Sequence, residues 1–328
     1  MIELLAPAGN PEALRGAVYA GADAVYFGAQ AFNARAEAGN FGPDELERAF
    51  SFCRTYGVKA YITLNTLVSD RELPDALALI DGLCALGGPD ALIVQDLGLA
   101  AALHRRYPAL PLHASTQMSF HSTLAVPLLR ERGFTRVVLA REMRRGDVEA
   151  VAAAGLETEL FAHGALCVCQ SGGCLMSALI GGRSACAQPC RLPYRAPNAY
   201  PLSLKDLCLA SHIPALLQSG VTSLKLEGRM KSAEYVYAVT KIYRRLLDER
   251  RAAAPAELDE LAAVFSRSGF TDGYFAGRVG KSMFGVRTEA DKARTRAAAV
   301  RIEKRRIPAS LALTVTARAP AMLTASSG

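Results

Sequence analysis

The chain has 328 residues, of which 51% are hydrophobic and 21% are charged, and its formal net charge is +7. The first residues lack a basic segment followed by a long apolar run, and no apolar stretch is long enough to span a membrane. We therefore expect no signal peptide, no membrane span and a cytoplasmic protein. The positive charge, much of it between residues 287 and 306, permits an acidic partner such as RNA without requiring one.

Apolar runs and amphipathic segments alternate along the first 250 residues. Asn10 is a predicted N-cap, Pro11 takes the first helical position and Gly21 follows the helix end. Strands are expected at 2–9, 24–28, 59–66, 91–96, 112–117, 136–140, 157–164 and 223–228. Helices are expected at 10–21, 42–57, 73–87, 96–108, 122–133, 145–155, 203–220 and 232–251.

Eight strands, most of them followed by a helix, predict an α/β fold of the TIM-type (β/α)8 barrel class. A doubly wound open sheet is the alternative, but the segment APAGNPEA after the first strand is not a phosphate-binding glycine fingerprint. In a barrel, catalytic groups lie at the C-terminal ends of the strands. Polar residues are frequent at these positions, including Asn65, Asp96, Glu142 and Glu159.

Five of the eight cysteines fall in one glycine-rich stretch directly after the strand predicted at 157–164. Four thiolates suit either zinc or an iron–sulfur cluster. The spacing C-x6-C-x11-C-x3-C has one pair at zinc-knuckle distance, and its first pair spans a flexible SGG, which favours a group larger than one ion. The four cysteines with this spacing are Cys167, Cys174, Cys186 and Cys190.

The cysteines also allow other interpretations. Cys169 is an alternative ligand, because a C-x-C segment bends easily. Structural disulfides are disfavoured, because nothing else in the chain indicates secretion. Cys53 and Cys84 fall on predicted helices and are expected to be buried rather than to bind a ligand.

Several segments together resemble the U32 family, conventionally labelled peptidase or collagenase-like protease. They are LLAPAGNPEALRGAVYAGADAVYFG, FNARAEAGNF, the cysteine segment HGALCVCQSGGCLMSALIGGRSACAQPCRLPYR, the KDL at 205–207 and GVTSLKLEGRMKSAEYV. The resemblance covers about residues 1–285. It implies that the chain is similar to the iron–sulfur enzymes of this family. These enzymes are oxygen-independent hydroxylases that act on ribosomal RNA, transfer RNA or a ubiquinone precursor, with prephenate as the hydroxyl source.

The resemblance also implies site residues. The [4Fe–4S] ligands map onto Cys167, Cys174, Cys186 and Cys190. The span before Cys186 is shorter than the family pattern, since only Ala185 separates it from Ser184. Cys169 therefore stays open as a substitute ligand.

Candidate catalytic and binding residues follow from side-chain chemistry at the strand ends. Arg141, Lys225 and Arg229 are expected to hold the carboxylates of a small acidic co-substrate such as prephenate. Glu227 and His163 are expected to transfer protons. For His163 the alternative is a buried core histidine.

Three domains are expected from these patterns. The catalytic barrel, with its cysteine-rich insertion after strand seven, covers 1–285, and a basic linker covers 286–308. Residues 309–328 alternate like a strand and resemble the start of the C-terminal β domain of longer U32 proteins, here truncated.

These observations favour oxygen-independent hydroxylation of an RNA base, with ribosomal RNA preferred. The alternative is the collagenase-like peptidase of the family name, although no G-x-S-x-G or H-E-x-x-H motif occurs. A second alternative is a non-catalytic RNA-binding protein, which explains the charge but not the cysteines.

Overall fold

The computed structural model describes residues 2–35, 38–171, 173–179, 186, 188–196 and 199–306. The strands are β1 (Glu3–Pro7), β2 (Ala24–Phe27), β3 (Lys59–Leu64), β4 (Ala91–Val94), β5 (Leu112–Ala114), β6 (Phe134–Val138), β7 (Glu157–Ala165), β8 (Asp206–Cys208), β9 (Ser223–Leu226) and β10 (Phe270–Thr271). The helices are α1 (Pro11–Tyr19), α2 (Pro43–Tyr56), α3 (Leu73–Ala85), α4 (Leu97–Arg106), α5 (Val126–Glu131), α6 (Arg145–Ala152), α7 (Met176–Leu179), α8 (Ile213–Leu216), α9 (Ala233–Glu249), α10 (Pro255–Val264) and α11 (Glu289–Ala297).

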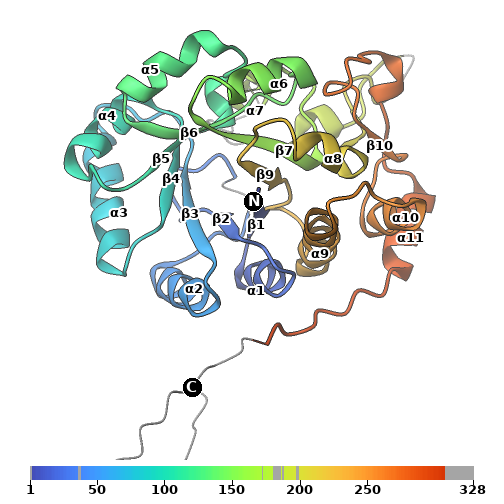
Figure 1. Ribbon diagram of the computed structural model, residues 1–328, viewed down its shortest axis with the longest axis horizontal. Coiled ribbons are helices and arrows are strands. Elements are labelled where there is room, and N and C mark those ends of the chain that lie inside the picture. The colour runs from blue at the N-terminus through green and yellow to red at the C-terminus, as the bar shows by residue number, and fades with distance from the viewer. Residues whose placement is uncertain are drawn as a thin grey trace, which may run out of the picture.

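Eight parallel strands close into a barrel surrounded by helices (Figure 1). Strands β1 to β7 pair in chain order, and β9 pairs with both β7 and β1 to complete the ring. Leu5 of β1, for example, lies opposite Ala24 of β2 on one side and Lys225 of β9 on the other. The predicted (β/α)8 class is therefore confirmed.

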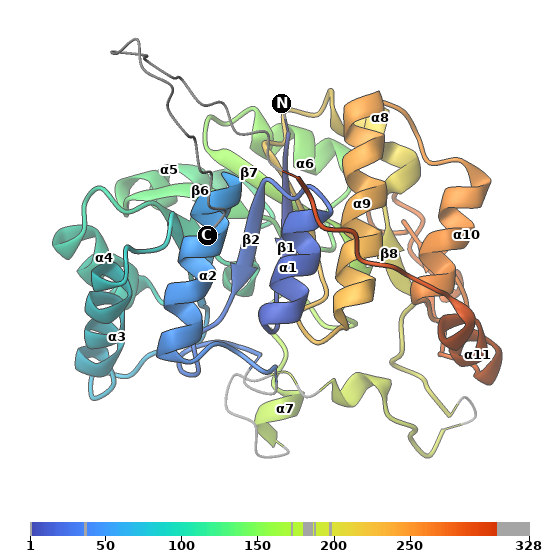
Figure 2. The same ribbon diagram turned by 90° about the horizontal axis from the view of Figure 1, so that it is seen from below.

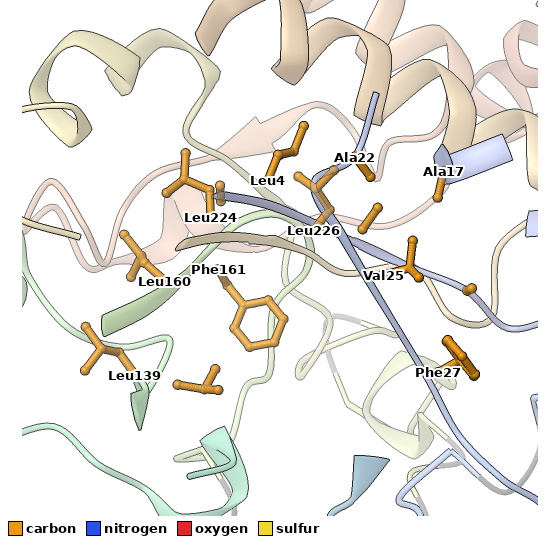
Figure 3. Close-up of a cluster of buried hydrophobic side chains, with 14 of the residues drawn as sticks. Leu4, Ala17, Ala22, Val25, Phe27, Leu139, Leu160, Phe161, Leu224 and Leu226 are labelled. Atoms are coloured by element: carbon orange, nitrogen blue, oxygen red, sulfur yellow. The ribbon is translucent and has the colours of Figure 1, made fainter. Parts of the chain in front are cut away.

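Side chains along each strand alternate between the side that faces the surrounding helices and the side that faces the inside of the barrel. In β9, Leu224 and Leu226 belong to the large buried cluster that also includes Val236 and Val239 of α9, whereas Lys225 points into the barrel. Figure 3 shows part of this cluster, with side chains from several strands packed together beside α1. The outward-facing side chains of β9 thus pack against the helices, whereas its inward-facing side chain carries a charge.

Capping residues fix several helix ends. The side chain of Asn10 accepts a hydrogen bond from Ala13 N at 2.8 Å, and Pro11 is the first residue of α1, as predicted. Gly57 ends α2 in the left-handed conformation, with φ of 65°. Asp96 caps α4 through Leu99 N at 2.8 Å, so this strand-end carboxylate has a structural role.

The helix predicted over 203–220 is wrong in its first part. Residues 206–208 form β8, which pairs antiparallel with the end of β7, and β10 extends this pair. The reason lies in β7, which continues to Ala165 and there offers an edge that another strand can cover. A short helix, α8, follows only at residue 213.

The predicted basic linker contains a helix. Thr288 caps α11 through Asp291 N at 3.1 Å, and α11 contacts α10. The extended residues 298–306 then run across α9 in the view of Figure 2, and Lys241 of α9 pairs with Glu303 at 3.3 Å. The predicted β segment at 309–328 lies outside the described residues, so the division into domains stays a prediction.

Crossing a bilayer requires a helix that is both long and apolar. None of the helices within the described ranges combines the two properties.

Candidate functional site

A cavity of about 230 Å³ opens at the C-terminal ends of the barrel strands. Its wall includes Tyr26 of β2, Thr63 of β3 and Phe161 of β7. In Figure 2, α7, which belongs to the segment after β7, lies at the end of the molecule opposite the N-terminus. The cavity is therefore enclosed between the barrel and the cysteine-rich segment, at the end of the barrel where the sequence predicts chemistry.

All five clustered cysteines line this one cavity: Cys167, Cys169, Cys174, Cys186 and Cys190. In the described part of the chain, no three His, Cys, Asp or Glu side chains are grouped closely enough to hold one metal ion. Burial raises the pKa of the Cys190 thiol, and the neighbouring Arg191 opposes that shift. Five soft donors around one space fit a multinuclear group such as an iron–sulfur cluster.

The other cysteines do not line this cavity. Cys53 is buried in the core on α2, as expected, and burial raises the pKa of its thiol to about 12. Cys84 is only partly buried on α3, packed against the core. Residues 180–185, the shortened span before Cys186, lie outside the described residues.

Glu227 is the carboxylate on the cavity wall. Its oxygens lie 3.3 Å from Arg35 Nη2 and 3.4 Å from the hydroxyl of Tyr26. Burial alone would raise the pKa of this carboxyl, but Arg35, Arg141 and Arg229 outweigh burial and lower the pKa. Glu227 is consequently ionised at neutral pH.

Two arginines act on Glu227: Arg35 through direct contact and Arg229 through its charge. Arg229 is 4% exposed and donates to Thr63 Oγ1 at 2.8 Å and to Asn33 Oδ1 at 3.1 Å. Burial, reinforced by the charge of Arg35, lowers the pKa of Arg229 to about 10. Sequence patterns did not single out Arg35 as a site residue. The segment that contains it, FNARAEAGNF, contributes to the family resemblance but gives no role to any residue.

Arg141 lies between the barrel and the cysteines. Its guanidinium carbon stands 4.0 Å from the centre of the Phe161 ring, and Nη1 lies 3.8 Å from Cys167 Sγ. Its buried Nε has no hydrogen-bond partner among the described residues. Ser171 fixes the backbone here, because its hydroxyl accepts from Arg141 N and donates to Glu142. Arg141 therefore presents an uncommitted donor at the site.

Lys225 reaches the cavity but is already paired. Its ammonium donates to Glu159 Oε1 at 2.7 Å and lies 4.2 Å from the centre of the Tyr26 ring. Both Lys225 and Glu159 are buried. Lys225 thus forms the floor of the cavity, and its predicted contact with a substrate carboxylate competes with Glu159.

His163 does not line the cavity. It is 1% exposed and packs against Tyr243 and Phe270, on the side of β7 that faces α9 and β10. Burial lowers its pKa to about 3. A pairing irregularity between Phe161 and His163 interrupts the strand's alternation, which the sequence does not reveal. The alternative of a buried core histidine describes this geometry, and the predicted proton transfer does not fit it.

The cavity wall carries a strong excess of positive charge. Of its described residues, one is a carboxylate, Glu227, and five are cations: Arg35, Arg141, Arg191, Lys225 and Arg229. Glu159 neutralises Lys225, yet most of the guanidinium charge stays unbalanced. An anionic group, such as a thiolate-bound cluster or a carboxylate, would restore the balance.

Comparison with known proteins extends this picture. The sequence model of the family described as Peptidase family U32 matches residues 9–284. A solved structure described as a U32 peptidase superposes with a TM-score of 0.50 at 13% identity, covering 70% of this chain and 94% of that one. At that identity the likeness concerns the fold alone.

Three curated relatives carry names that describe activities. The 23S rRNA 5-hydroxycytidine C2501 synthase of Escherichia coli is 41% identical over 84% of this chain, which spans 42% of that protein. The tRNA hydroxylation protein P1 of Bacillus subtilis is 38% identical over 75% of this chain and 63% of its own length. A protein named Collagenase from Porphyromonas gingivalis is 33% identical over 84% of this chain and 74% of its own length.

Proposed function

The chain belongs to peptidase family U32, and we propose that it acts as an iron–sulfur enzyme that hydroxylates a base in RNA without molecular oxygen. Ribosomal RNA is the favoured substrate, because the relative named for 23S rRNA shares 41% identity. The observation that carries the proposal is the cavity at the barrel end, which five thiols and five cations line. A second relative named for tRNA hydroxylation supports the same class of reaction.

The cofactor we propose is a [4Fe–4S] cluster held by Cys167, Cys174, Cys186 and Cys190, with Cys169 as the alternative ligand. When bound, such a cluster supplies electron transfer or a Lewis-acidic iron. The role of the protein is to hold four deprotonated thiols around the cavity and to surround them with cations. The guanidinium group of Arg141, whose Nη1 lies 3.8 Å from Cys167 Sγ, places one of these positive charges directly beside a proposed ligand.

The hydroxyl donor we propose is a small carboxylic acid of the prephenate type. Guanidinium groups bind carboxylates through paired N–H donors, and the cavity offers Arg35, Arg141 and Arg229. Arg141 is the best candidate, because its Nε has no partner among the described residues. Arg229 is committed to Thr63 and Asn33, so it is better suited to shape the cavity and to stabilise negative charge there.

Glu227 is the proposed general base. In the proposed exchange, R–H + D–OH → R–OH + D–H, the C–O bond of the hydroxyl donor breaks, a proton leaves the ring carbon, and the donor takes up that proton and two electrons. The lowered pKa keeps Glu227 ionised, and its position between Tyr26 and Arg35 fixes its carboxylate toward the cavity.

Peptide hydrolysis is the alternative, since one relative is named Collagenase. A cysteine peptidase needs a histidine beside its nucleophile. Among the described residues that line the cavity there is no histidine, although five cysteines are present. The cavity therefore supports a ligand role for the thiols better than a nucleophilic one.

The test is mass spectrometry of nucleosides from ribosomal and transfer RNA, compared between cells with and without the gene. We expect one nucleoside to lose the mass of one oxygen atom in the deletion and to regain it when the intact gene is returned. A variant with Cys174→Ala should not restore it. Unchanged RNA, together with thiol-dependent cleavage of gelatin by the purified protein, would establish the peptidase instead.

A further inference from the structure

A second group of cations lies beside the cavity, gathered on one aromatic ring. The Nζ of Lys231 stands 3.0 Å from the centre of the Phe265 ring, and the guanidinium carbons of Arg287 and Arg267 stand at 4.4 and 4.9 Å. We call these four residues the Phe265 cluster. The ring thus gathers three basic side chains at one place.

Little negative charge balances the Phe265 cluster. Asp206 of β8 is its carboxylate, and one of its oxygens pairs with Arg267 at 2.5 Å. The described contacts give Lys231 and Arg287 no carboxylate partner in salt-bridge range, and the buried Nε of Arg287 has no hydrogen-bond partner there. Burial lowers the pKa of Lys231 to about 7; the charges of Arg267 and Arg287 act in the same direction, and the carboxylate of Asp206 opposes them only in part. A second anion would therefore stabilise this group.

The Phe265 cluster adjoins the cavity. Lys231 follows Arg229 and Met230 in the loop after β9, and Gln188 of the cavity wall lies 3.7 Å from the sulfur of Met230. The cluster is thus a second positive site next to the first.

The position in the barrel also suits a phosphate. In (β/α)8 enzymes, phosphate groups are often bound by the loops after the last two barrel strands near a helix N-terminus. Lys231 lies in the loop after β9, the eighth barrel strand, and Ser232 caps the 17-residue helix α9 directly after it. A phosphate oxygen held by Lys231 and Arg287 would lie within the positive end of that helix.

We propose that the Phe265 cluster binds a backbone phosphate of the RNA strand whose base enters the cavity. This inference rests on the proposed function. It assigns positioning to Lys231 and Arg287, which would hold the strand by its phosphate without reading its sequence. Arg267 keeps its pair with Asp206 and contributes positive charge.

The test compares RNA binding by two double variants of the full chain. Lys231→Met with Arg287→Met removes both uncommitted cations and keeps apolar contact with Phe265. The matched control, Arg105→Met with Arg132→Met, removes two exposed cations at the other end of the barrel, where α4 and α5 end. A fluorescein-labelled single-stranded oligoribonucleotide is titrated at several salt concentrations. Thermal melting and the iron content of each variant check that the fold and the cavity remain intact.

We expect the Lys231/Arg287 variant to bind at least about 10-fold more weakly than the wild type at low salt. Its plot of log affinity against log salt should be shallower by about 0.7 for each phosphate that the variant no longer neutralises. The control should match the wild type in slope, and Lys231→Arg should retain most of the affinity.

Equal slopes for the two double variants, or a wild-type chain that does not bind the oligonucleotide, would overturn the phosphate site. The two proposals fail separately. If cellular RNA gains no oxygen while binding depends on Lys231 and Arg287, the hydroxylase function fails and the phosphate site stands. If RNA is hydroxylated while the variants behave like the control, only the phosphate site fails.

Discussion

The barrel interior has two halves. We call the half at the N-terminal ends of the strands the lower half, and the half at their C-terminal ends, where the cavity lies, the upper half. The two halves carry the same kinds of charged side chain in opposite arrangements. In the lower half, Arg136 pairs with Glu3 at 2.5 Å and with Glu159 at 3.2 Å, and Glu159 also accepts from Lys225 at 2.7 Å. Both of these cations have a carboxylate partner. In the upper half, the guanidinium groups around Glu227 outnumber the carboxylates of the described cavity wall. A network in which every cation has a carboxylate partner needs no ligand. A network with more cations than carboxylates has positive charge left to bind an anionic ligand.

This contrast explains why burial has different consequences in the two halves. Burial would raise the pKa of Glu3, yet Arg136, Tyr61 and Ser223 hold it below its usual value, so the pairing is internal to the fold. In the upper half the pKa of Arg229 falls to about 10, because burial and Arg35 both oppose its charge. We infer that the upper half stores electrostatic strain that a bound anion relieves.

The largest expected effect separates the cavity cysteines from those elsewhere. Cys174→Ala or Cys190→Ala should abolish RNA hydroxylation completely, because either change removes a proposed cluster ligand. Cys53→Ala removes an equally small side chain from the core on α2 and should cost only about 1 kcal/mol of stability. Complementation of a deletion strain, read as the modified nucleoside, compares the three. Full activity of the Cys174→Ala protein would contradict the ligand assignment.

The next effect concerns the carboxylate of the upper half. Glu227→Gln keeps the shape but cannot accept a proton, so the rate should fall by about 10²- to 10⁴-fold. The lowered pKa of Glu227 keeps it deprotonated as the pH falls from 7 to about 5, so the wild-type rate should not drop across that range on account of this group. Single-turnover rates measured over this range check both points. A variant as fast as the wild type would remove Glu227 from the mechanism.

A change in the lower half should affect stability instead. Arg136→Met leaves Glu3 and Glu159 buried near each other without their shared cation, which should cost about 3–5 kcal/mol of unfolding free energy. The folded-state pKa of Glu3 is lowered, so its pairing stabilises the wild type above the unfolded pKa and is lost as the pH falls through the folded pKa. Urea unfolding at several pH values should show a weaker acid dependence in the variant. Loss of activity in a variant that is fully folded would contradict the division into halves.

The smallest effect should follow from a change in geometry at constant charge. Arg141→Lys keeps the positive charge but loses the paired donors of the guanidinium group. The KM for the acidic donor should therefore rise by about 10-fold, with a smaller change in kcat. Steady-state kinetics with varied donor would show this split. An unchanged KM would mean that the donor carboxylate binds elsewhere.

The barrel could be predicted from sequence because each strand and helix carries its own local signal. Asn10 and Pro11 mark the start of α1, and alternation in β9 separates Leu224 from Lys225. The cysteine-lined cavity could also be predicted from the sequence, since five thiols in one stretch indicate one common site. These features depend on residues close together in the chain.

The features that sequence patterns did not reveal depend on residues far apart in the chain. His163 is turned toward α9 by a pairing irregularity, and β8 forms because β7 offers an edge. Arg35 reaches Glu227 across 192 positions of the sequence, and a pattern confined to one segment does not reveal such a contact. The partners of a charged residue, and hence whether it is structural or available to a ligand, require the three-dimensional fold.

The most direct test of the account is the metal content of the chain purified without oxygen. Iron, zinc and acid-labile sulfide are measured together with the absorption spectrum. We predict about four iron and about four sulfide per chain, and a brown protein. The matched Cys53→Ala protein should give the same values, and Cys174→Ala should give neither iron nor sulfide in those amounts. Stoichiometric zinc without labile sulfide in the wild-type chain would contradict the claim that the upper half of the barrel holds an iron–sulfur cluster.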